Sequence, residues 1–65
     1  MGDNQSLQVI ADNIKNIDKQ IAEVRELIDF LEEAKQDVSK PRSQLAALIL
    51  EKGNWESALR NRGYI

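Results

Sequence analysis

Apolar residues recur at alternating steps of three and four along the first half of the chain, and polar residues fill most of the positions between them. This spacing predicts a helix with one narrow apolar stripe, as in a coiled coil, where the stripe packs against a partner helix. In heptad notation the stripe consists of Leu7, Ile14, Ile21 and Ile28 at position a, and of Ile10, Ile17, Val24 and Leu31 at position d.

The residues that flank this stripe do not favour a parallel two-stranded coil. Such a coil prefers Leu at position d and opposite charges across positions e and g, whereas three of the four d residues here are β-branched. Position e holds Ala11, Asp18, Arg25 and Glu32, and position g holds Asn13, Gln20, Leu27 and Ala34. Toward its C-terminal end the apolar face widens, which predicts packing against more than one neighbour.

The segment Ser39-Lys40-Pro41 predicts the end of the first helix, because Pro disfavours a helical conformation in the residue before it. Ser39 and Pro41 also suit the first turn of a new helix, with Ser39 as its cap. A reversal here gives a helical hairpin. The alternative is one kinked helix, because Val38, Leu45 and Ile49 keep the heptad phase across the break.

In the second half of the chain, two glycines mark the expected ends of helices. The run from Leu45 to Leu50 is apolar on most sides, which predicts a buried helix. Gly53 is expected to stop this helix, Asn54 to cap a short last helix, and Gly63 to close it. We therefore predict one all-α domain over residues 1–65: a capping region 1–5, a long helix 6–38, a turn 39–40, a helix 41–52 and a short helix 54–62.

A reversal near residues 39–40 would place Leu48 beside Leu31 and Trp55 beside Val24. The expected hairpin core is Leu27, Ile28, Leu31, Leu45, Leu48, Ile49, Trp55 and Leu59. The N-terminal half of the stripe would then lack a partner within the chain, and its exposure would be unfavourable. The expected oligomer interface is Leu7, Ile10, Ile14, Ile17, Ile21 and Val24.

Length and composition support self-association. A chain of 65 residues has a marginal core of its own, and with no Cys and no His it lacks disulfides and the usual zinc or haem ligands. We therefore expect an oligomeric coiled coil or a small helix bundle, such as a dimer of hairpins. We expect no metal and no cofactor.

Catalytic chemistry is not expected. The adjacent acids Glu32 and Glu33 lie outside the stripe and are predicted to be solvated, and no serine has a histidine to activate it. We predict a non-enzymatic assembly, adaptor or regulatory module that binds itself and another protein.

The alternative function is that of a small oligomeric DNA-binding regulator. Residues 1–39 hold nine acidic and four basic side chains, whereas residues 40–65 hold two acidic and five basic ones, although the net charge is −2. Lys52, Arg60 and Arg62 would contact phosphates in that alternative. Folding of the two oppositely charged halves onto each other is the simpler explanation.

Membrane attachment is not expected. No apolar run approaches the ~18 residues of a transmembrane helix, and the chain start does not resemble a secretory signal. Gly2 and Ser6 match the N-myristoylation pattern, but the acidic Asp3 disfavours the modification. We expect a cytoplasmic protein.

Overall fold

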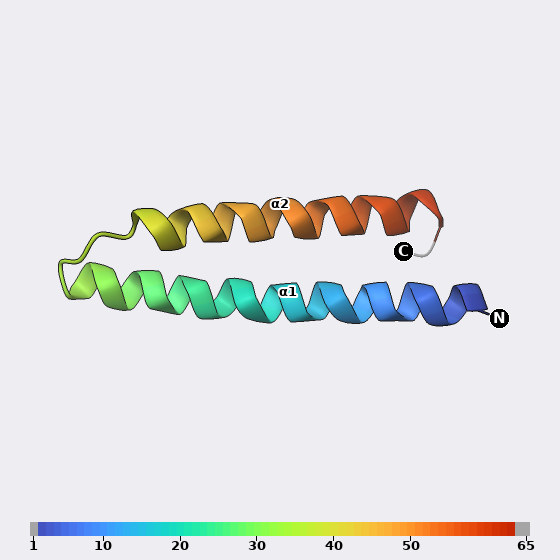
Figure 1. Cartoon of the computed structure of the whole chain (residues 1–65), viewed down its shortest axis with the longest axis horizontal. Helices are drawn as coiled ribbons and strands as arrows, with labels where there is room; N and C mark the ends of the chain where they lie inside the picture. The colour runs from blue at the N-terminus through green and yellow to red at the C-terminus, as the bar shows by residue number, and fades with distance from the viewer. Residues whose placement is uncertain (1, 64–65) are drawn as a thin grey trace.

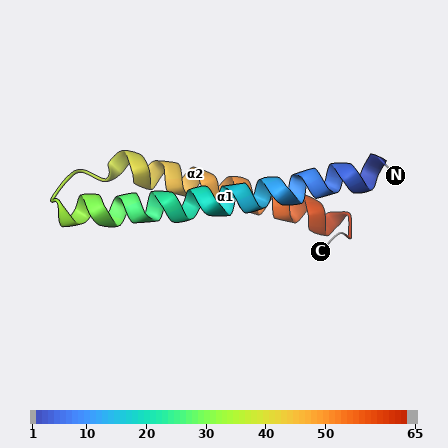
Figure 2. The same ribbon diagram turned by 90° about the horizontal axis from the view of Figure 1, so that it is seen from below.

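The computed structural model describes residues 2–63, with side chains from residue 7 onward, and over this range the chain forms two helices. Helix α1 spans Gly2–Glu33 and helix α2 spans Ser39–Asn61. The helices run antiparallel, side by side, with the loop at one end (Figure 1). Seen from below, they cross at a shallow angle (Figure 2). The predicted all-helical hairpin is confirmed, and no strand occurs within the described range.

The core lies along the line where the two helices meet. Its buried cluster consists of Ile17, Ile21, Val24, Ile28 and Leu48, with Val38 and Leu45 packed against it. The middle of the apolar stripe of α1 therefore faces α2 of the same chain. Burial of each large aliphatic side chain is worth about 1.5–3 kcal/mol, so this small cluster supplies much of the hydrophobic stabilisation of the hairpin.

Helix α1 ends at Glu33, earlier than the expected end at Val38. Lys35 adopts a left-handed conformation with φ of 62°, which turns the chain away from the helix axis. Its N–H donates to the carbonyl oxygen of Glu32 at 3.0 Å, and the N–H of Gln36 donates to that of Leu31 at 2.8 Å. These two bonds form a Schellman motif, in which a Lys occupies the position that usually holds Gly.

The N-terminal boundary of α1 also differs from the prediction. The helix begins at Gly2 instead of Ser6, so residues 2–5 of the expected capping region are already helical. The side chains that were expected to cap it, Asp3, Asn4 and Ser6, lie outside the described part of the structure.

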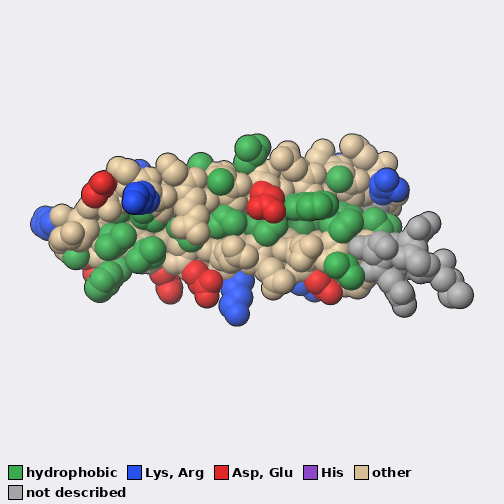
Figure 3. Space-filling view, in the orientation of Figure 1, with side chains coloured by type: hydrophobic (Ala, Val, Ile, Leu, Met, Phe, Trp, Pro, Cys, Tyr) green, Lys and Arg blue, Asp and Glu red, His purple; other side chains and the backbone are tan. Residues whose placement is uncertain are grey.

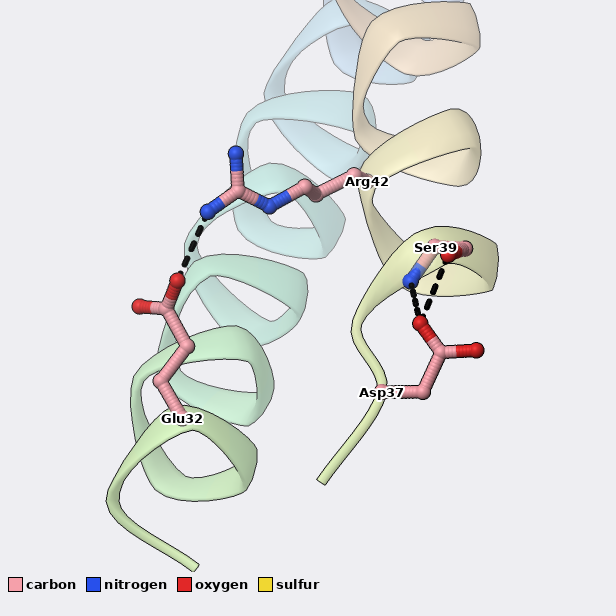
Figure 4. Close-up of polar contacts among 4 residues, drawn as sticks. All are labelled: Glu32, Asp37, Ser39 and Arg42. Atoms are coloured by element: carbon pink, nitrogen blue, oxygen red, sulfur yellow. Dashed lines mark hydrogen bonds and ion pairs between the residues drawn. The ribbon is translucent and has the colours of Figure 1, made fainter. Parts of the chain in front are cut away.

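Residues 34–38 form the loop, in place of the expected turn at 39–40. One carboxylate oxygen of Asp37 accepts hydrogen bonds from the Ser39 hydroxyl at 2.6 Å and from the Ser39 backbone N–H at 2.9 Å (Figure 4). Asp37 thus satisfies a free N–H at the start of α2, the role that was expected of Ser39. Pro41 lies in the first turn of α2, as predicted.

These hydrogen bonds make the folding of the hairpin sensitive to acid. The Ser39 hydroxyl, and then its N–H, hold the pKa of the Asp37 carboxyl below its ordinary value of 3.8. Because the folded state has the lower pKa, the unfolded state binds more protons in acid. The stabilising contribution of Asp37 is therefore complete above the ordinary pKa and is lost as the pH falls through the folded pKa.

We expect Asp37→Asn to reduce the loss of thermal stability between about pH 5 and about pH 2, because it removes the titrating carboxyl. Melting curves by circular dichroism at a series of pH values measure this slope. Ser39→Ala should reduce the slope in part, since it removes the first of the two donors. Equal slopes for the original chain and Asp37→Asn would show that Asp37 does not contribute.

The early end of α1 changes the register of the hairpin. Lys52 Nζ lies 2.6 Å from Asp18 Oδ1, and Arg42 Nη2 lies 2.6 Å from Glu32 Oε2 (Figure 4 shows the second pair). The midpoints of these pairs are residues 35 and 37, so the reversal is centred in the loop. Trp55 consequently lies beside Ile17, and not beside Val24 as expected.

Helix α2 runs without a break through Gly53 and Asn54. The expected separation into helices 41–52 and 54–62 is therefore wrong. Gly53 has no left-handed φ, and an added Cβ there would meet nothing within 4 Å, whereas Gly63 has φ of 73° and follows the end of the helix as predicted. Packing of one continuous face against α1 outweighs the weak helix propensity of a single Gly.

We expect Gly53→Ala to raise the free energy of unfolding by about 1 kcal/mol, the difference between Ala and Gly inside a helix. The matched control is Gly63→Ala, which should lower stability because its left-handed conformation strains an L-residue. Chemical denaturation followed by circular dichroism measures both. A destabilising Gly53→Ala would indicate that the helix stops there.

Candidate interaction surface

The face of α2 that contacts α1 was only partly recognised from the sequence. Spaced by three and four, it consists of Pro41, Leu45, Leu48, Lys52, Trp55 and Leu59, and Val38 of the loop continues the same row. Lys52 interrupts this apolar row. The sequence therefore suggested that the contact face ran through Ile49 instead. The recurring spacing of Leu45, Leu48, Trp55 and Leu59 was the available signal.

Lys52 remains charged at this otherwise apolar row because α1 provides a counter-ion. Its ammonium lies 2.6 Å from Asp18 and 4.0 Å from Glu56. The hydrogen bond to Asp18 raises the pKa of Lys52 above its ordinary value of 10.5, so the residue carries its charge throughout the physiological range. A polar residue at such a position favours one register over its competitors.

The ion pairs lie along one edge of the contact between the helices. Residues seven apart share one side of a helix, because seven residues make almost two turns. We call this side the ion-pair edge and define it as Ala11, Asp18, Arg25 and Glu32 of α1 with Arg42, Ile49 and Glu56 of α2. Five of its seven residues are charged. The pair between Arg42 and Glu32 joins the two helices at this edge, and Asp18 pairs with Lys52 of the contact row.

The opposite edge is almost free of charge. We call it the Trp55 edge and define it as Asn13, Gln20 and Leu27 of α1, Ala34 at the start of the loop, and Gln44, Glu51 and Ala58 of α2. Glu51 is its single charged residue. Trp55 borders this edge, and its Nε1 lies 3.5 Å from Glu51 Oε2.

A groove of about 380 Å³ opens on the Trp55 edge. Its walls are Asn13, Asn16, Ile17 and Gln20 of α1 and Leu48, Glu51 and Trp55 of α2. Figure 3 shows one broad face of the hairpin, on which hydrophobic side chains form a band along the line between the helices and gather near the loop. Acidic and basic side chains lie mainly toward the borders of that face.

The predicted core residues divide into two groups. Ile28, Leu48 and Leu59 are buried, and Leu31 and Leu45 are partly buried, whereas Trp55 is 37 % exposed and borders the Trp55 edge. Leu27 and Ile49 were expected in the core but are 45 % and 46 % exposed. The register of the hairpin turns them to its two edges, which corrects the prediction.

The predicted oligomer interface is also divided by the structure. Ile17, Ile21 and Val24 are covered by α2 of the same chain, so they are core residues of the hairpin. Leu7, Ile10 and Ile14 are half-buried, near the end of α1 that extends past α2 (Figures 1 and 2). For these three residues a contact with another chain stays a prediction.

The three basic residues of the DNA-binding alternative differ in whether they are free to contact phosphates. Lys52 is engaged by Asp18 and Glu56, whereas Arg60 and Arg62 are exposed at the C-terminal end of α2.

Among the described side chains no cluster of three or more acidic residues could hold a metal ion. Within the described range, neither helix is long and apolar enough to cross a membrane.

Comparison of the chain with protein-family models, with curated proteins and with solved structures found no significant match.

Proposed function

We propose that this chain is a non-enzymatic protein–protein interaction module that associates with itself into a small helix bundle. In that role it would act as an assembly, adaptor or regulatory subunit. The proposal follows from the accessible surface of the hairpin, from the large hydrophobic side chains that it exposes, and from a composition without the Cys or His of most catalytic and metal sites.

The accessible surface carries the proposal. The hairpin exposes 5143 Å², whereas a compact monomer of 7.4 kDa exposes about 4200 Å². The excess of about 900 Å² is close to the area of about 800 Å² that each partner buries in a standard interface. An extended two-helix hairpin of this size thus has as much extra surface as one protein interface removes.

Exposed side chains support the same conclusion. As many large hydrophobic residues are exposed as are buried among the described side chains. The exposed ones are Val9, Leu27, Phe30, Ile49, Leu50 and Trp55. Single exposed apolar residues are common, but Leu27 and Phe30 are adjacent on α1 and enlarge the apolar surface near the loop.

The proposal is tested by melting the chain at increasing concentrations, from low micromolar to hundreds of micromolar. Self-association stabilises the folded state by mass action, so we expect the melting temperature to rise with concentration. A melting temperature that is independent of concentration would contradict the proposal. Salt-dependent binding of a DNA duplex by a monomer would instead favour the DNA-binding alternative, in which Arg60 and Arg62 contact phosphates.

A further inference from the structure

We propose that a second copy of this chain covers the Trp55 edge, so that two hairpins form a four-helix bundle with both ion-pair edges facing water. This inference rests on the proposed self-association and names the surface and the arrangement through which it occurs.

Charge decides which edge is buried. On the ion-pair edge the side chains of Arg42 and Glu32 are 61 % and 46 % exposed, so water still solvates both charged groups. Covering this edge would desolvate several charges, a cost that ion pairing often fails to offset. On the Trp55 edge only Glu51 would be affected, and the remaining groups are amides and apolar side chains.

Symmetry identifies the occupant as a second copy. In a two-fold dimer the same edge is used twice, so two Trp55 edges meet and no ion-pair edge is covered. A head-to-tail contact would place the Trp55 edge of one hairpin on the ion-pair edge of the next, which buries charge and leaves the assembly open. The closed dimer avoids both costs.

The available area is sufficient for such a dimer. The 23 residues of α2 span about 35 Å, and two packed helices are about 20 Å wide. One face of the paired region therefore measures about 700 Å², close to the area per partner in a standard interface. It is also close to the surface excess of this chain.

The Trp55 edge is complementary to itself when the two hairpins are antiparallel. Given the register of the ion pairs, the middle of α2 lies near Ala22 of α1. Leu27 and Ile17 are equally far from Ala22 along α1. A two-fold axis at that level therefore places Leu27 of each copy against the groove beside Ile17 and Trp55 of the other.

Leu27→Glu and Ile49→Glu form a matched pair that tests this arrangement. The two residues are aliphatic, 45 % and 46 % exposed, and lie on opposite edges of the hairpin. We expect Leu27→Glu to weaken dimerisation by about thirtyfold or more, as the loss of a central interface residue does, and Ile49→Glu to leave it nearly unchanged. Light scattering after size-exclusion chromatography gives the mass, and circular dichroism shows that each variant keeps its helices.

A monomeric original chain would overturn the proposed self-association itself. A dimeric original chain that stays dimeric with Leu27→Glu, or dissociates with Ile49→Glu, would overturn the assignment of the interface to the Trp55 edge. If Leu27→Glu loses its helices, cross-linking decides, because the chain has no Cys of its own. A mixture of Leu27→Cys and Asn16→Cys chains should form a heterodimeric disulfide, and its absence would exclude the antiparallel arrangement.

Discussion

Ile17→Asp should abolish the cooperative unfolding transition of the hairpin at every chain concentration. Ile17 is 6 % exposed and belongs to the buried cluster, so the change removes a large aliphatic side chain and places a carboxylate among apolar groups. Truncation of such a residue alone costs about 2–5 kcal/mol. A domain of this length has roughly 3–10 kcal/mol of stability in total, so little would remain.

The matched control for this change is Phe30→Asp. Phe30 is on the same helix but 66 % exposed, and an acidic residue there faces water. Thermal melts followed by circular dichroism should show a folded Phe30→Asp chain and an unfolded Ile17→Asp chain. If Ile17→Asp melted cooperatively as a monomer, Ile17 would not lie in the core of the hairpin.

Leu59→Ala should lower the free energy of unfolding of the whole chain by about 2–5 kcal/mol. Leu59 is 2 % exposed, the lowest value among the described core residues, although it lies only one turn from the end of α2. Because α2 is continuous through Gly53, the loss at Leu59 is transmitted to the entire hairpin. A separate last helix would instead unfold locally and leave the main transition unchanged.

Leu50→Ala is the control for this second prediction. Leu50 is in the same helix and is 66 % exposed, so its truncation should change the free energy of unfolding by less than about 0.5 kcal/mol. Chemical denaturation measures both variants. Equal effects at Leu59 and Leu50 would contradict the continuous helix and its packing against α1.

The apolar stripe of α1 was predictable because its spacing has no interruption and agrees with the helix period. The hairpin followed from the single Pro and from the apolar run in the second half of the chain. The end of α1 was not predictable in the same way. Lys35 takes a conformation that Gly adopts without cost, and no local feature of Lys distinguishes it from a helical residue.

The mistakes in the predicted core and oligomer interface follow from the misplaced end of α1. A later reversal moves Trp55 from Ile17 to Val24 and makes the N-terminal stripe appear uncovered. The face of α2 that contacts α1 was also hard to recognise from the sequence. Lys52 on that face resembles a solvent-exposed residue unless Asp18 is known to lie opposite it. The two edges depend on this pairing, so a tertiary contact was needed to distinguish them.

Sedimentation equilibrium of the unmodified chain tests the self-association of the hairpin most directly. We expect, at high micromolar concentration, a mass twice the 7.4 kDa of one chain, with helix content retained. A mass of 7.4 kDa across the whole concentration range, with the helices intact, would contradict it.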